Sequence, residues 1–390
     1  MHYPIIIFVF FALFFALSTD DELSKDSITF INDYTSLTNN SKSKAYWFLM
    51  GLDAPKGIDP IEYGKAKFSD PKTEYKPAET PFIISCNTDK ISCFEKIELE
   101  KENITDTLSE YQYLLENYHH FLTLEDYRTL NVTTIEGPGP LYFHLVFAHR
   151  LFLTSQLMNP DGKFVITNLK NNLVQLESIL QQQDTLIGLM VLTHMYATSL
   201  DFINYFSEKH NIVVSLPALK DLTTTFKNTL LTEFMLTVNL YKDMDANPNF
   251  FEEKGNAPAW YIKLIFKPNM NINQEARKIR YFMDWLDLDN DTAFKAWRDE
   301  SIPEHTTNRI RNFAGSALLE IASNDYRDYF IMGKLLNAKI ALSNDSFAAT
   351  HPFSKQLEII RNEESVCFEF PDSSQYEAYN CIANVYSLTE

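Results

Sequence analysis

Residues 164–208 read FVITNLKNNLVQLESILQQQDTLIGLMVLTHMYATSLDFINYFSE, and this stretch decides the fold. Its Leu, Ile, Val and Phe residues recur at steps of three and four, which is the period of an α-helix. The polar run Gln181–Thr185 interrupts the pattern. The segment therefore predicts two long helices, Phe164–Gln183 and Leu186–Glu208. Both are apolar on more than one side, as expected of helices that are widely buried in a bundle.

The same period recurs along most of the chain. Glycine is scarce, with 10 residues among 390, against about 7 per cent in average proteins. Few tight turns are then available, which favours helices over a many-stranded sheet. The further helices expected from the pattern are Leu108–Leu122, Leu141–Leu157, Pro217–Met244, Gln274–Leu286, Thr292–Arg298 and Ala314–Leu342.

The last 45 residues have a different pattern. Gln356–Ile360 and Ser365–Phe370 show short alternating or β-branched runs, with a turn at 362–364 between them. This pattern predicts a β-hairpin. The predicted fold is mainly α: a multi-helix bundle-like body over 46–345, with a small disulfide-closed β appendage over 346–390 packed on it.

The N-terminus resembles a targeting segment. Ile5–Leu17 is an unbroken run of 13 apolar residues, and Ala16 and Ser18 are small, as a cleavage site requires. We therefore expect residues 1–18 to be a signal peptide. The segment before Ile5 contains no Lys or Arg, so an uncleaved membrane anchor or a buried core segment remain alternatives. Residues 19–45 are polar and read as a tether or a short helix.

Four cysteines form two local pairs in the sequence, Cys86 with Cys93 and Cys367 with Cys381. An even count in an exported chain suggests disulfides. Three pairings are possible, and the local one closes the smallest loops. Neither pair has the C-x-x-C spacing of zinc or redox sites, so we predict two structural disulfides.

The charge balance constrains the partners. The chain has 34 basic and 52 acidic residues, a net charge of −18. Such a surface repels phosphate backbones and anionic lipid headgroups. Nucleic acid is therefore not an expected partner, and contact with a membrane is expected only through an uncleaved N-terminal segment.

Metal-binding patterns are missing from the sequence. There is no HExxH motif, and His119 and His120 are adjacent, so they point to different faces of a helix. Asp287, Asp289 and Asp291 resemble the start of a calcium loop, but Thr292 and Arg298 replace its required glycine and glutamate. Asp289 is better explained as a helix N-cap, and we predict neither a metal nor a cofactor.

Motifs for nucleophilic catalysis are missing as well. There is no G-x-S-x-G elbow and no glycine-rich phosphate loop. Triads and acid pairs assemble from distant residues, so His119, His144, His149 and Glu233 are the residues whose burial and proximity would reveal one. Without such a site, we expect the largest pocket to be lined mainly by Phe, Tyr, Leu and Met.

Residues 46–67, YWFLMGLDAPKGIDPIEYGKAK, contain a loop rich in glycine and proline. We predict that Trp47 and Leu49 are buried and that Asp53 satisfies backbone donors in the turn. The alternative is a ligand-binding loop formed by Gly51, Asp53 and Pro55.

Three features resemble a group of uncharacterised bacterial envelope proteins: residues 46–67, in which Gly51–Pro55 is the specific motif, the short Cys86–Cys93 loop before a helix, and the C-terminal cysteine pair. Those proteins have an N-terminal hydrophobic segment, a Gly-x-Asp-Ala-Pro loop and a helical body. The resemblance implies a periplasmic or cell-envelope location and a helical fold. It implies no activity.

The expected function is therefore that of an exported, non-enzymatic binding or scaffold module of the bacterial envelope. Its 30 Phe, 20 Tyr and 4 Trp residues fill helix contacts or line a site for an apolar ligand, and an envelope protein is the other expected partner. The alternative is a hydrolase whose catalytic residues are dispersed in the sequence.

Overall fold

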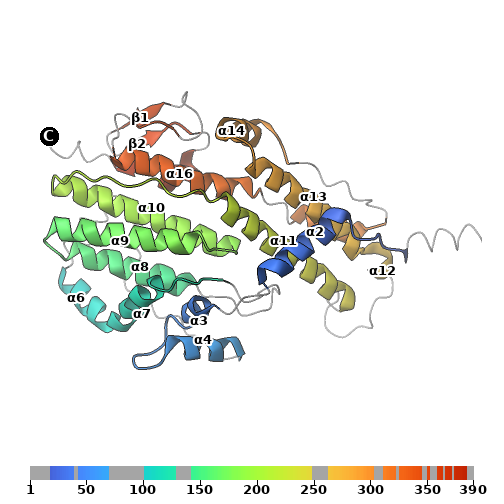
Figure 1. The fold of residues 1–390 in the computed structure, drawn as a ribbon, viewed down its shortest axis with the longest axis horizontal. Coiled ribbons are helices and arrows are strands. Elements are labelled where there is room, and N and C mark those ends of the chain that lie inside the picture. The colour runs from blue at the N-terminus through green and yellow to red at the C-terminus, as the bar shows by residue number, and fades with distance from the viewer. Residues whose placement is uncertain are drawn as a thin grey trace, which may run out of the picture. The chain divides into compact units, whose positions relative to one another are not determined.

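The computed structural model describes most of the chain. The described residues are 18–38, 43–69, 101–128, 142–247, 262–302, 311–321, 325–344, 349–351, 358–362, 365–370 and 373–383. The predicted signal peptide and the Cys86–Cys93 pair lie outside them. Within the described residues the chain is mainly α-helical with one small antiparallel sheet, which confirms the predicted fold class (Figure 1).

The helices divide between two compact units. Unit 1 contains α2 (Lys25–Thr38), all but the first turn of α11 (Thr223–Ala246), α12 (Ile262–Ile265), α13 (Pro268–Leu286), α14 (Asn290–Asp299) and α15 (Phe313–Ile321). The helices of unit 2 are α3 (Lys44–Met50), α4 (Pro60–Ser69), α6 (Lys101–Glu110), α7 (Gln112–Leu122), α8 (Tyr142–Leu157), α9 (Gly162–Leu180), α10 (Leu186–Lys209), α16 (Arg327–Asn344) and α17 (Ser373–Asn380). The body expected over 46–345 thus contributes residues to both units.

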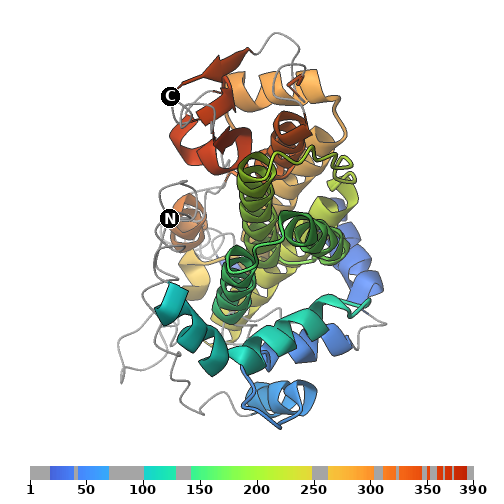
Figure 2. The same cartoon turned by 90° about the vertical axis from the view of Figure 1, so that its left-hand side faces the viewer.

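The quoted segment forms the centre of unit 2 as α9 and α10, which pack along each other (Figures 1 and 2). Side chains at both starts replace missing helical hydrogen bonds. Asp161 accepts from the backbone N–H groups of Lys163 and Phe164, and Thr185 accepts from that of Gly188. Among the described helices, α10 alone is long and apolar enough to cross a membrane; most of it is buried inside the unit, as in a core helix.

Three predicted helices differ from the observed ones. Leu108–Leu122 was expected as one helix, and the structure divides it at Tyr111 between α6 and α7. Ala314–Leu342 was expected as one helix and is two, α15 and α16. The helix expected from Pro217 begins at Thr223, because the preceding chain bonds to α16 instead. Asn344 and Asn337 accept from the backbone N–H groups of Leu216 and Leu219 at 2.6 and 2.8 Å, and donate to their carbonyl oxygens.

The C-terminal sheet has three antiparallel strands in the order β1 (Ile359–Arg361), β2 (Ser365–Phe368) and β3 (Cys381–Ala383). The predicted hairpin is β1–β2, and the third strand was not expected. Cys367 lies opposite Cys381 in the β2–β3 register, and the two form a disulfide. β3 and α17 contact α10, so the sheet packs on the core of unit 2.

Unit 1 includes the polar segment that follows the predicted signal peptide. Part of that segment is α2, which packs on α13. Phe30 is 1 % exposed and meets Phe234 of α11 at 5.7 Å between ring centres. Arg280 pairs with Asp26 at 2.9 Å, so this segment is a docked helix.

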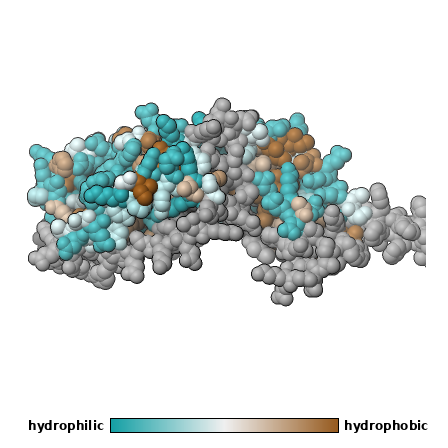
Figure 3. Space-filling view, turned by 90° about the horizontal axis from the view of Figure 1, so that it is seen from below, coloured by the Kyte–Doolittle hydropathy of each residue, from teal (hydrophilic) through white to brown (hydrophobic). Residues whose placement is uncertain are grey.

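The described residues on the face in Figure 3 are mostly hydrophilic, and apolar residues occur there in small groups.

Candidate functional site

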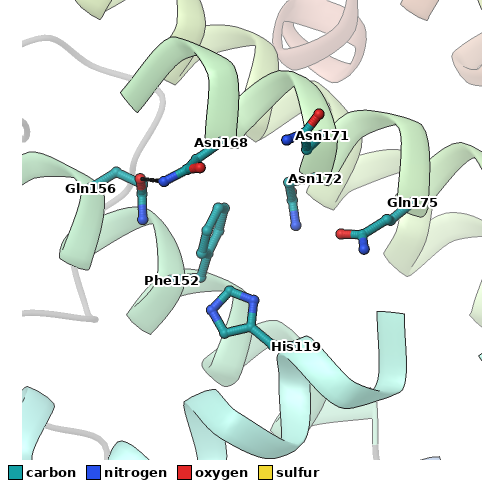
Figure 4. A pocket seen from close by; sticks show the side chains of 7 residues that line it. All are labelled: His119, Phe152, Gln156, Asn168, Asn171, Asn172 and Gln175. Carbon is teal, nitrogen blue, oxygen red and sulfur yellow. Dashed lines mark hydrogen bonds between the residues drawn. The ribbon is translucent and has the colours of Figure 1, made fainter. Parts of the chain in front are cut away.

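A pocket of about 200 Å³ lies between α7, α8 and α9 in unit 2. Five of its seven lining side chains are amides, and α9 carries four of the five. Figure 4 shows these residues converging from the three helices. They are His119, Phe152, Gln156, Asn168, Asn171, Asn172 and Gln175.

The local sequence explains the amide face. The four amides of α9 follow the spacing i, i+3, i+4, i+7, which places them on one side of the helix. An adjacent side of the same helix carries the buried leucines 169, 173 and 176. α8 contributes Phe152 and Gln156, which are one turn apart. This amide spacing is the sequence signal that could have identified the pocket.

Two of the amides bond to each other. Asn168 donates from Nδ2 to Oε1 of Gln156 at 3.3 Å, and Gln156 donates from Nε2 to the hydroxyl of Ser155 at 3.0 Å. The amides of Asn171 and Gln175, in contrast, make no hydrogen bond to the residues that the structure describes. They are therefore available to a ligand.

Asn172 forms the inner wall and belongs to a buried network. It donates from Nδ2 to the Tyr118 hydroxyl at 2.8 Å, and its Oδ1 accepts from the Ser199 hydroxyl at 3.3 Å. Ser199 in turn lies 2.9 Å from Nε2 of His149. The side chains of this network are almost fully buried. The network thus connects the pocket wall to the core of unit 2.

His119 is the one titratable side chain among the seven. Its ring meets Phe152 edge to face at 5.4 Å. Partial burial lowers the pKa of His119 below its usual value, so the imidazole is neutral at pH 7. No carboxylate, ammonium or guanidinium group is among the described residues of the lining. The pocket therefore offers hydrogen bonds and a small aromatic surface, but no pair of groups for acid–base catalysis.

The lining of this pocket differs from the Phe, Tyr, Leu and Met lining that was predicted for the largest pocket. Phe152 is the only one of its described lining residues of those types. The aromatic side chains instead fill contacts between helices, such as Tyr118 against Phe152 at 5.9 Å. Contacts between aromatic rings of this kind stabilise cores.

The Gly51–Pro55 loop shows a different contact from the one predicted. Asp53 bonds to the side chain of Lys67 at 2.5 Å and lies 3.9 Å from Nε2 of His144. The prediction that Asp53 satisfies backbone donors is therefore not what the structure shows. Leu49 is buried as expected, whereas Trp47 is only half-buried.

The three histidines singled out as catalytic candidates make different contacts within unit 2. His119 lines the pocket, His144 lies beside Asp53, and His149 contacts Ser199. Burial lowers the pKa of His144 and brings that of His149 to about 3. Glu233 belongs to the other unit and is half-buried.

A further expectation concerns the start of a helix. Asp289 caps α14 by accepting from the backbone N–H of Thr292 at 3.1 Å, which confirms the prediction. Within the described ranges, no group of three or more His, Cys, Asp or Glu residues is placed to hold a metal ion.

No family model matches the chain, and neither the curated proteins nor the solved structures contain a match to it. The geometry of the pocket is therefore the basis for a functional proposal.

Proposed function

We propose that this chain is an exported binding protein whose amide-lined pocket holds a small, neutral, hydrogen-bonding ligand. The observation that carries the proposal is the lining: five amides, one neutral imidazole and one phenyl ring. An amide both donates and accepts hydrogen bonds. A ligand that does the same, without a charge, is the best match to such a surface.

The size of the pocket limits the ligand. At about 200 Å³ it is smaller than the roughly 300–1,000 Å³ typical of sites for drug-sized molecules. It accommodates one ring or one short chain end. An apolar ligand does not suit it, because burying an amide without a partner costs about 1–3 kcal/mol.

Export to the bacterial envelope is part of the proposal. The apolar run Ile5–Leu17 supports it, and so does the Cys367–Cys381 disulfide, because disulfides persist in oxidising compartments. The intact mass of the protein from its native compartment tests it. A chain shortened by about the first 18 residues is expected, and a full-length chain that partitions with membranes would establish the anchor instead.

Ligand-observed NMR tests the pocket. The neutral probes are glucose, galactose, myo-inositol and acetamide; tetramethylammonium and inorganic phosphate are the charged counterparts. We expect at least one neutral probe to bind and neither ion to bind. Asn171→Ala and Gln175→Ala should each weaken that binding about tenfold, the effect of losing one hydrogen bond of about 1.4 kcal/mol.

Val174→Ala is the matched control, because Val174 lies on α9 beside these residues in sequence but is 60 % exposed and does not line the pocket. It should leave binding unchanged. The proposal fails if no neutral probe binds, or if the two amide variants bind as the wild type does.

A further inference from the structure

The hydrogen bonds of Asn172, at the inner wall of the pocket, have a defined donor and acceptor direction that is set by the buried residues behind it. A carboxamide oxygen only accepts, so the Ser199 hydroxyl, 3.3 Å from Oδ1 of Asn172, is the donor in that bond. The single hydroxyl proton of Ser199 is then used. Oγ of Ser199 must therefore accept the proton that lies between it and His149.

This arrangement requires one tautomer of His149. The ring is fully buried, and burial together with the nearby charges of His194 and Arg150 lowers its pKa to about 3, so it is neutral. Because Oγ of Ser199 accepts, the proton of the neutral ring is on Nε2. The series of donors then runs from His149 to Ser199 and from Ser199 to Asn172.

The reverse arrangement is the alternative. If the ring proton were on Nδ1, Ser199 would donate to His149 and Asn172 would turn its nitrogen toward Ser199. The Asn172 oxygen would then accept from Tyr118. Every bond in the network would change direction together, so the tautomer of His149 reports the orientation of the Asn172 amide.

The observed orientation presents a donor to the ligand. One N–H of Asn172 is used by Tyr118, and Figure 4 shows the amide nitrogen of Asn172 pointing into the pocket between Phe152 and Gln175. A ligand must bring an oxygen acceptor to this position. Asn171 and Gln175, whose amides are open, add both donors and acceptors near it, which suits hydroxyl groups.

The charges of the protein disfavour anionic and cationic ligands in this pocket. The net charge of −18 opposes anions, and the described lining has no cationic group to offset this. A cation would meet the N–H donor of Asn172, and the described lining has no carboxylate to bind it.

Building on the proposed function, we infer that the pocket binds a neutral polyhydroxylated ring, such as a sugar or cyclitol, through Asn172 as a donor held in position by Ser199 and His149. Ser199 and His149 are positioning residues: both are buried and act on the ligand only through the Asn172 amide.

The tautomer is measured first, on the full chain without any ligand. Long-range ¹H–¹⁵N NMR at pH 7 should show the Nε2–H form for His149, assigned by comparison with the His149→Gln variant. The Nδ1–H form overturns the inference whatever the binding results are. Ser199→Ala, which removes the acceptor of the Nε2 proton, should shift the His149 signals.

Binding is measured next, with glucose, galactose and myo-inositol as probes and acetamide for comparison. A polyol is expected to bind the wild type, and Ser199→Ala to weaken it at least tenfold although the substituted side chain does not touch the ligand. Asn172→Asp, which replaces the donor by a carboxylate of the same shape, should abolish it. Ser199→Ala is small and buried, so it remains informative if Asn172→Asp does not fold.

The outcomes separate the two proposals. Binding of acetamide without any polyol overturns the polyol inference and leaves the proposed function intact. Binding of a polyol equally well by Ser199→Ala overturns the role of the network. Binding of none of the neutral probes overturns both.

Discussion

Gly51 and Gly64 lie against each other where α3 meets α4, and neither position has room for a side chain. A Cβ at Gly64 would collide with the carbonyl oxygen of Trp47, and one at Gly51 with that of Pro60. The two short helices can approach this closely only because both residues lack a Cβ. The close packing of α3 on α4 therefore explains both glycines.

Gly64→Ala should destabilise the protein by about 1–3 kcal/mol, as inserting a methyl group into a filled contact typically does. Lys65→Ala, an exposed change on the same helix, is the control and should cost less than about 1 kcal/mol. Denaturant unfolding measures both. Equal stability of the two variants would show that α3 and α4 can separate without cost.

The ion pair between Lys339 and Asp201 is buried, with Nζ 2.7 Å from the carboxylate and side-chain exposures of 1 % and 11 %. Lys339→Met should cost about 3–5 kcal/mol, because it removes the ion-pair partner of a buried carboxylate. The double variant Lys339→Met/Asp201→Leu should recover much of that loss. If the double variant is no more stable than the single one, desolvation is not the main cost.

Lys334→Met is the matched control for that experiment. Lys334 is on the same helix and pairs with Asp221 at 2.9 Å, but the Asp221 side chain is 62 % exposed. Solvent screening makes such pairs worth at most about 1 kcal/mol. A large loss of stability in this variant would contradict the distinction between the two pairs.

His351 should make the protein less stable in acid. It is 5 % exposed, and burial lowers its pKa to about 4, whereas an unfolded histidine titrates near pH 6.5. Between these values the unfolded chain binds the proton and the folded chain does not. The free energy of unfolding therefore falls as the pH decreases from 6.5 to about 4, by at most about 1.4 kcal/mol per pH unit from this group.

The His351→Phe variant tests this, because His351 already packs between the rings of Phe368 and Phe370. Its unfolding free energy should fall less steeply than that of the wild type over the same interval. Parallel curves for the two proteins would show that the pKa of His351 is the same in the folded and the unfolded chain.

The Cys367–Cys381 disulfide closes a loop with a sequence separation of 14. Replacing both cysteines by alanine should lower the free energy of unfolding by about 3 kcal/mol in the chain-entropy model. Non-reducing peptide mapping should recover this linkage in the wild type. A free thiol at either position in the native protein would contradict the structure.

The sequence alone determined the helical architecture. In α9 and α10 the apolar residues repeat at steps of three and four, and the caps Asp161 and Thr185 lie within three residues of the predicted starts. These signals are local, because a helix bonds within its own segment. The same holds for Asp289 at the start of α14, and for the cysteine pair that closes the sheet.

Only the tertiary structure decided which polar residues form a site. The amides from Asn168 to Gln175 share one face of α9, and in the sequence such a face is indistinguishable from one that points to solvent. It became a pocket because α7 and α8 cover it with His119, Phe152 and Gln156. Likewise Ser199 and His149 are 50 positions apart. Their contact, and the polarity that we infer for Asn172, arise from packing between helices, which the periodicity of a single segment does not encode.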